Sequence, residues 1–188
     1  MTSSTRSSEE LLDAAVSLIA ESGLDGLTLT TVAERAGVSR ATAYRELGDK
    51  KALVSAVGRH EIGRMVATAY STIDLFAPAT EIARSATLFA IRYLREHAAF
   101  DYLRTHEPAW LLTIATHGQS EHNLVETVAA FAEPLIAARD DKTLALPPRQ
   151  AAEVIVRIVL SHALLRDSSL TDEQIADTAA RAITTRKN

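Results

Sequence analysis

Residues 28–51 read TLTTVAERAGVSRATAYRELGDKK, and this stretch decides the fold. Thr28 and Ser39 each stand directly before a short run with apolar residues at helical spacing, and hydroxyl side chains are preferred helix N-caps. Between the two runs, Gly37 supplies the backbone freedom that a sharp turn after a helix requires. Two short capped helices joined by a tight turn are the pattern of a helix-turn-helix motif.

The second of these helices presents polar residues suited to a DNA duplex. Ser39 and Thr42 place two hydroxyls in its first turn, where free N–H groups and the helix dipole favour a phosphate. Small and long polar side chains then alternate on a face with little to bury, which a major groove can accept. We therefore predict DNA contacts from Thr28, Ser39, Arg40, Ala41, Thr42, Tyr44, Arg45 and Lys50. The alternative from pattern alone is an ordinary α-hairpin whose polar face meets water.

The segment VAERAGVSRATAYRELGDKKAL resembles the N-terminal signature of the tetracycline-repressor (TetR) family of bacterial regulators. The match is dense and in register at Thr28, Val32, Ala33, Ala36, Gly37, Val38, Ser39, Thr42, Tyr44, Gly48 and Lys50. It covers about residues 9–57 and favours the DNA-binding interpretation. Leu47 stands where the family usually carries phenylalanine, and it can still fill the small core. Glu46 departs further, because phosphates repel a carboxylate; it either points away or accepts from a cytosine amino group.

Composition indicates a helical globular protein. The chain has 188 residues, 47% of them hydrophobic, with no Cys, 7 Gly and 5 Pro. Without Cys there is no disulfide framework, which fits a cytoplasmic location. Residues 1–8 are polar and rich in Ser, so we expect a disordered start rather than a signal peptide. No apolar run approaches the roughly 20 residues of a membrane span, and we expect no membrane association.

The charge is unevenly distributed along the chain. The net charge is −4, yet residues 35–64 hold seven basic and three acidic side chains, a local sum of +4 that leaves −8 for the rest. A basic face on an acidic body still attracts phosphates within a Debye length of about 8 Å. The total charge therefore does not exclude a DNA partner.

We predict an all-α fold of about nine to ten helices. A three-helix head containing the helix-turn-helix motif is joined by a fourth helix to a C-terminal helical body. The predicted domains are a disordered N-terminus (1–8), a DNA-binding domain (9–50) and a ligand-binding and dimerisation domain (51–188). The expected helices beyond the motif span about residues 7–22, 49–72, 80–96, 98–104, 108–117, 120–139 and 148–165, and a last one opens with the capping box of Thr171 and Gln174.

The segment 148–165 is apolar on nearly all sides of a helix, so it must be covered all round. We predict a two-fold homodimer of four helices, built from this helix and the one at 120–139, as the dimers of the resembled family also imply. The alternative is a central helix buried within one subunit. The predicted interface residues are Leu124, Val128, Phe131, Ile155, Ile158, Val159 and His162.

The resemblance also implies a cavity for a small-molecule effector inside the body. The candidate lining residues are Phe89, Arg92, Tyr93, Phe100, Tyr102, His106, Trp110, Leu111, His117 and Phe131. Their aromatic character favours an apolar or amphipathic effector. Each aromatic residue alone is equally explained as part of the core.

No pattern in the chain supports a cofactor, a metal site or an enzyme. His117 and His122, with Glu121 and Glu126 nearby, could share a helix face that binds a metal, but Gly118 interrupts the helix and a solvated polar face explains the run as well. Ser161 and His162 are neighbours on a helix and point about 100° apart, so they form no catalytic pair. Nucleophile elbows and phosphate loops are absent from the sequence.

Together these observations predict a ligand-responsive transcriptional regulator, a repressor that binds a palindromic operator as a homodimer and is released by its effector. Arg40 and Thr42 are expected on base edges, and Arg45 on either a base or a phosphate. Phosphate contacts are expected from Thr28, Ser39, Tyr44 and Lys50. The alternative is a ligand-binding helical protein whose helix-turn-helix is vestigial.

Overall fold

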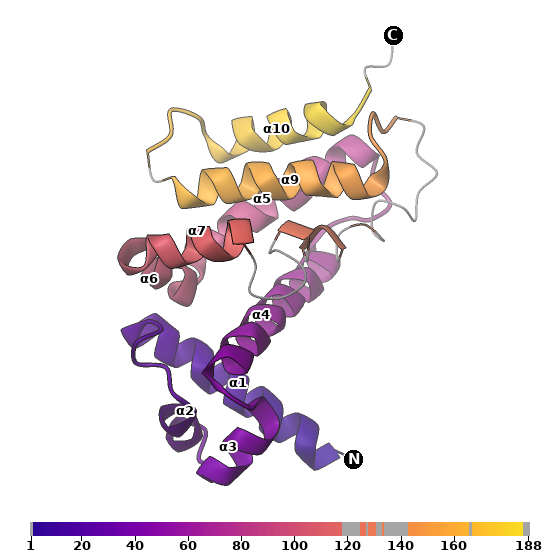
Figure 1. The fold of residues 1–188 in the computed structure, drawn as a ribbon. Helices are drawn as coiled ribbons and strands as arrows, with labels where there is room; N and C mark the ends of the chain where they lie inside the picture. The colour runs from indigo at the N-terminus through magenta and orange to yellow at the C-terminus, as the bar shows by residue number, and fades with distance from the viewer. Residues whose placement is uncertain are drawn as a thin grey trace. The chain divides into compact units, whose positions relative to one another are not determined.

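The computed structural model describes residues 2–117, 125–126, 128–130, 133, 143–165 and 167–185. Every named element in these ranges is a helix (Figure 1), and one isolated antiparallel bridge joins Leu144 and Thr184. The helices are α1 (Thr2–Ser22), α2 (Leu29–Arg35), α3 (Arg40–Leu47), α4 (Lys50–Thr72), α5 (Ala79–Glu96), α6 (Ala98–His106), α7 (Pro108–His117), α9 (Pro148–Leu164) and α10 (Asp172–Ile183). The predicted all-α class is confirmed. None of the described helices is long and apolar enough to cross a membrane.

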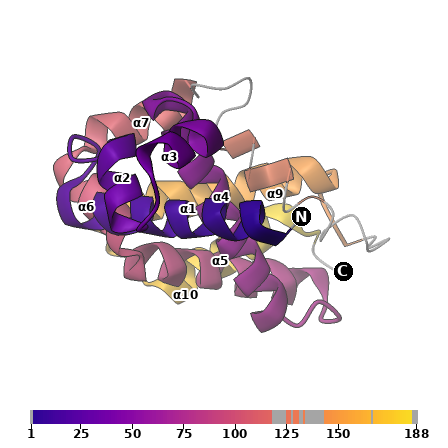
Figure 2. The same ribbon diagram turned by 90° about the horizontal axis from the view of Figure 1, so that it is seen from below.

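The chain divides into two compact units, of which the first comprises residues 1–63 and 97–113. Its core is built where α2 and α3 pack on α1, and it encloses the fully buried side chains of Leu11, Leu27 and Val32. The helix α6 packs against α1 in the same unit, beside the end of α1 that lies away from the N-terminus (Figure 2). The predicted head ended at residue 50 because the motif ends there, whereas the packing of α6 on α1 is a long-range contact that no local pattern reports.

The helix α1 begins at Thr2, earlier than the start predicted at residue 7. The expected disordered segment is therefore helical from Thr2 onward in the structure. Its Ser and Thr residues each disfavour a helix by only a few tenths of a kcal/mol relative to better helix formers. Once the apolar residues of α1 have nucleated the helix, such residues extend it at small cost.

The second unit comprises residues 64–96 and 114–188, and in its described part α5, α9 and α10 lie side by side (Figure 1). The helices meet at one buried cluster of three alanines and an isoleucine, Ala83, Ala151, Ala180 and Ile183. The predicted capping box opens α10, since Thr171 Oγ1 accepts from Gln174 N at 3.2 Å and Gln174 Oε1 accepts from Thr171 N at 2.9 Å.

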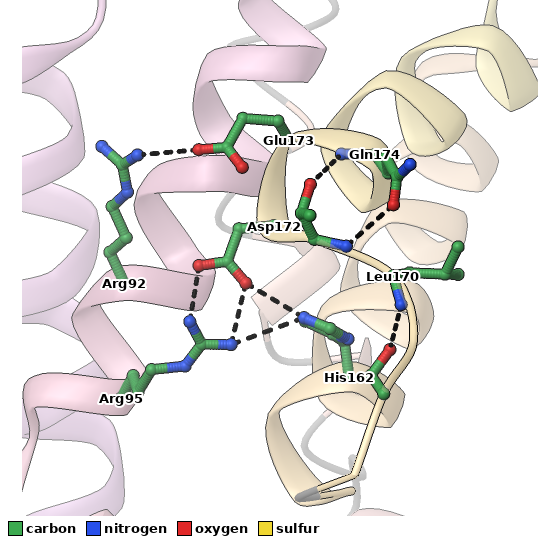
Figure 3. Close-up of polar contacts among 9 residues, drawn as sticks. Arg92, Arg95, His162, Leu170, Asp172, Glu173 and Gln174 are labelled. Atoms are coloured by element: carbon green, nitrogen blue, oxygen red, sulfur yellow. Dashed lines mark hydrogen bonds and ion pairs between the residues drawn. The ribbon is translucent and has the colours of Figure 1, made fainter.

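A polar cluster joins three helix ends in this second unit (Figure 3). Arg95, in the last turn of α5, donates two hydrogen bonds to Asp172 at 2.6 and 2.8 Å. His162, in the last turn of α9, lies 3.1 Å from the same carboxylate. The Arg95 guanidinium and the His162 ring, in the last turns of two helices, thus meet an anion at the N-terminus of α10, where the helix dipole favours negative charge. Burial alone would raise the pKa of Asp172, but the bonds from Arg95 and His162 hold it below its ordinary value of 3.8.

The predicted dimer-interface residues divide into three groups. Leu124 and Phe131 lie outside the described residues. Val159 and His162 are buried by their own chain, with 5% and 9% of their surface exposed. Val128 and Ile158 are half-buried, and the half-buried Ile155 packs against the cluster around Ala151. Part of the apolar character of α9 is therefore explained by α5 and α10, and the interface stays a prediction.

Candidate nucleic-acid interface

The helix α2 begins with a reciprocal cap. Thr28 has extended backbone angles (φ −132°, ψ 155°), and its Oγ1 accepts from Thr31 N at 3.1 Å. In return Thr31 Oγ1 accepts from Thr28 N at 3.0 Å. A threonine at the third helical position thus takes the part that Glu or Gln plays in the usual capping box. The N-cap predicted at Thr28 is observed.

The turn between α2 and α3 depends on one glycine. Gly37 has φ +67°, and the next residue, Val38, donates its N–H to Ala33 O at 3.0 Å. Gly37 N also donates to Glu34 O at 3.3 Å, so the two bonds form the Schellman arrangement that ends a helix. A Cβ placed on Gly37 would meet no atom within 4 Å. The glycine is therefore required by the backbone conformation and not by a lack of space.

The helix α3 has an inner and an outer face. Ser39 caps it, its Oγ accepting from Thr42 N at 3.1 Å, as predicted. Ala43 and Leu47 are buried, so Leu47 does fill the core in place of the phenylalanine usual at this position. The outer face carries Arg40, Ala41, Tyr44 and Arg45, all exposed, and Tyr44 shows 53% of its surface. A short helix with its polar side chains outward is what major-groove recognition requires.

Two arginines of the basic segment are paired with carboxylates. Arg45 donates to Glu46 Oε1 from Nε at 3.3 Å and from Nη2 at 3.1 Å, which shows where the unexpected Glu46 points. Arg35 binds Glu21 through two hydrogen bonds of 2.8 and 2.7 Å. Those bonds lower the pKa of the Glu21 carboxyl below its usual 4.5. Glu46 is already counted in the local sum of +4, whereas Glu21 lies outside residues 35–64, so its pairing with Arg35 lowers the charge offered to a phosphate.

Lys50 opens α4 and reaches back to the head. Asp49 Oδ1 accepts from Ala52 N at 2.7 Å, so Asp49 caps the N-terminus of α4. The Lys50 ammonium donates to Leu24 O at 2.7 Å. Glu107, a residue that the sequence did not single out, accepts from Leu24 N at 2.8 Å. Glu107 and Leu24 are 83 residues apart, so no local signal could have paired them.

The predicted effector-pocket residues fall in both units. Phe89, Arg92 and Tyr93 lie on α5, where the rings of Phe89 and Tyr93 are 5.7 Å apart and Arg92 pairs with Glu173 at 3.2 Å. The first unit holds Phe100, Tyr102, His106, Trp110 and Leu111. There Tyr102 and His106 stack at 4.3 Å. Phe131 lies outside the described residues, as does the side chain of His117. A single pocket formed by these residues stays a prediction.

The residues considered as metal ligands lie mostly outside the part of the chain that the structure describes. His122 and Glu121 are not described, and neither is the side chain of His117. Within the described part of the chain, no group of three or more His, Cys, Asp or Glu side chains is arranged to hold a metal ion.

Comparison with known proteins bears on the identity of the helix-turn-helix. Residues 11–57 match the family model described as bacterial regulatory proteins, tetR family. The HTH-type transcriptional regulator BetI of Brucella canis is 30% identical over 129 residues, which are 67% of this chain and 60% of BetI. The chain thus spans less than two thirds of that relative's length.

Solved structures with similar folds cover nearly the whole chain. The TetR family repressor AlkX from Dietzia sp. strain DQ12-45-1b, implicated in biodegradation of n-alkanes, has a TM-score of 0.71 at 20% identity, covering 92% of this chain and 93% of AlkX. AibR, crystallised with isovaleryl coenzyme A and operator DNA, has a TM-score of 0.52 at 20% identity, covering 95% of this chain and 98% of AibR. At this identity the two structures show the fold alone.

Proposed function

Because this chain belongs to the tetR family of bacterial regulatory proteins, we propose that it is a ligand-responsive transcriptional regulator that binds DNA through α3. The proteins to which it is similar are transcription regulators and not enzymes, in agreement with the prediction from sequence. The observation that carries the proposal is the division of α3. Ala43 and Leu47 anchor it in the core while Arg40, Tyr44 and Arg45 stand exposed.

The proposed contacts follow from position along α3. Arg40 is its first residue and Thr42 lies in its first turn, so both are assigned to base edges, because recognition helices read bases with their N-terminal residues. Ser39 and Thr28 each cap a helix N-terminus, where phosphate contacts are favoured. Tyr44 and Lys50 are assigned to phosphates as well. Arg45 could serve either role, with Glu46 restraining its guanidinium.

We further propose that the chain acts in the cytoplasm as a repressor and as a homodimer. Two copies related by a two-fold axis would place α3 in successive major grooves of a palindromic operator. AlkX is a repressor, and AibR has been crystallised with both operator DNA and an acyl coenzyme A. These likenesses support a small effector of apolar or amphipathic character. Effector binding would favour a conformation whose α3 separation no longer fits the two half-sites.

Selection of bound sequences from a random duplex pool, repeated at two salt concentrations, tests the proposal. The expected result is a palindrome whose recovery survives the higher salt, because base contacts add affinity that does not depend on counterion release and is therefore kept when salt weakens that term. Recovery of unrelated sequences that vanish at higher salt would overturn the regulator and support a ligand-binding protein with a vestigial helix-turn-helix.

A further inference from the structure

The backbone N–H and the backbone carbonyl of Leu24 are each hydrogen-bonded by a side chain that is distant in the sequence. Leu24 follows α1 and is buried, with 7% of its surface exposed. Its N–H donates to Glu107 Oε1 at 2.8 Å, and its carbonyl accepts from Lys50 Nζ at 2.7 Å. The two partners come from the α6–α7 junction and from the first residue of α4. Three segments of the first unit therefore meet at Leu24.

The turn before Leu24 leaves room for the Glu107 carboxylate to come close to the backbone. Gly23 ends α1 with φ +67°, donating its N–H to Ile19 O at 2.9 Å. A Cβ on Gly23 would lie 2.1 Å from Glu107 Oε1 and 2.6 Å from Tyr102 Cε1. Such distances are far below van der Waals contact, so only glycine leaves room for the carboxylate. The close approach and the hydrogen bond both place Glu107 Oε1 directly against this turn.

Glu107 is fixed to the junction between two helices. Its N–H closes α6 by donating to Leu103 O at 2.8 Å, and its carbonyl accepts from Trp110 N at 3.1 Å in the first turn of α7. A displacement of the junction therefore moves the carboxylate, and the carboxylate bears directly on Leu24. A hydrogen bond to a charged acceptor is stronger than one between neutral groups, so Leu24 is held firmly.

Lys50 supplies the connection to DNA. A cation in the first turn of a helix opposes the helix dipole, so helix stability does not explain Lys50. Its ammonium carries three donors, and the bond to Leu24 uses one of them. Two donors are left for a phosphate. The Leu24 carbonyl thus determines where the ammonium stands before DNA arrives, which lowers the ordering cost of the contact.

We propose that Glu107 is a positioning residue for DNA binding: it holds Leu24 so that the Leu24 carbonyl anchors Lys50 for a phosphate contact. The inference rests on the proposed function. It implies that the α6–α7 junction is a point at which the state of those helices is passed to the head. The coupling runs within the first unit, through Leu24 and Lys50.

A set of matched variants tests the proposal, with the palindrome obtained by selection as the probe. Glu107→Asp keeps the charge but shortens the reach, whereas Glu107→Gln keeps an oxygen at the same position. Glu107→Asp should weaken binding about five- to tenfold on both the palindrome and a random duplex, and should lower the salt slope by about 1. Glu107→Gln should weaken binding less than Glu107→Asp does, because its oxygen can still reach Leu24 N although the bond is no longer charge-assisted. Glu96→Asp, at an exposed position at the end of α5, is the control and should change nothing.

The double variant Glu107→Asp/Lys50→Ala separates positioning from general damage to the fold. If Glu107 acts through Lys50, the aspartate should cost no further affinity once Lys50 is alanine. Additive losses would overturn the proposal, as would an unchanged salt slope in Glu107→Asp. Failure of the wild type itself to select a palindrome would instead overturn the proposed function.

Hydrogen exchange of the wild-type protein provides a second measurement, which does not depend on how well the variants fold. Because anchoring and phosphate binding support each other, the Leu24 amide should exchange more slowly in the DNA complex than in the free protein. Equal exchange in the two states would overturn the proposal.

Discussion

Arg40 stands exposed at the start of α3, the position from which a recognition helix reaches bases. Arg40→Ala should cost about 1–3 kcal/mol on the palindrome and relax the preference at one base pair. The measurement is fluorescence anisotropy with the palindrome and with a random duplex of equal length. An equal loss on both duplexes would contradict a base contact. Glu34→Ala is the control, since Glu34 is exposed on α2 and is not assigned to DNA.

Lys50 should behave differently from Arg40, because a phosphate contact carries no sequence information. Lys50→Ala should weaken binding to both duplexes and reduce the slope of log affinity against log salt by about 1. Titration at several salt concentrations measures the slope. Lys51→Ala, one residue further along α4 and also exposed, is the matched control. A sequence-dependent loss for Lys50→Ala would reverse the assignment.

At the level of the single helix, two glycines offer opposite tests. Gly37 has φ +67° while Gly58 lies within α4, and neither would bring an added Cβ within 4 Å of another atom. Gly37→Ala should lower the free energy of unfolding by about 1–2 kcal/mol, because the left-handed conformation disfavours a β-carbon. Gly58→Ala should raise it by about 0.5–1 kcal/mol, because alanine is the better helix former. Thermal unfolding distinguishes the two, and a shift of the same sign in both variants would contradict the explanation.

The polar cluster of Arg95, His162 and Asp172, where α5, α9 and α10 meet, predicts a dependence of stability on pH. The folded pKa of Asp172 lies below its ordinary 3.8, so its contribution is complete above about pH 3.8 and is lost as the pH falls through the folded value. Asp172→Asn should therefore reduce the free energy of unfolding by about 1–3 kcal/mol at pH 7. The difference should disappear below the folded pKa.

Chemical denaturation at pH 7 and at low pH measures this difference. Asp167→Asn is the control, since Asp167 is an exposed carboxylate between α9 and α10. A destabilisation of Asp172→Asn that persisted unchanged at low pH would show that the carboxylate charge does not stabilise the polar cluster.

The elements that the sequence predicted correctly depend on contacts within a few residues. The caps at Thr28, Ser39 and Thr171 and the turn at Gly37 each involve partners at most five residues away. Their side-chain chemistry is therefore visible in the sequence. The features that the sequence did not predict depend on packing between distant segments. The bond from Leu24 to Glu107 spans 83 residues and has no local sign.

The candidate site shows the same division. The outward residues of α3 were identified because a helix of known phase and one buried face determines the other face. The ion pairs of the basic segment 35–64 have no such signal, since Arg35 on α2 could have turned to solvent and instead binds Glu21. Burial of Val159 by its own chain also required the positions of α5 and α10.

At the scale of the whole molecule, the acidic total and the basic segment 35–64 have separate consequences. The net charge is −4, so the rest of the chain repels the duplex while the segment 35–64 attracts it. Binding that relied on charge alone would be weak and strongly salt-dependent. A dimer that engages two half-sites gains affinity beyond what one basic segment of limited charge supplies, because the second copy of α3 binds at high effective concentration.

The spacing of the half-sites tests the central claim, that two copies of α3 read one palindrome together. The affinity and stoichiometry of the protein would be measured on the selected palindrome and on a version with roughly 5 base pairs, half a helical turn, inserted at its centre. Two copies should bind the first duplex, and the insertion should abolish the joint binding because the second major groove then faces away. Equal affinity for both duplexes, or binding of a single copy, would contradict the account.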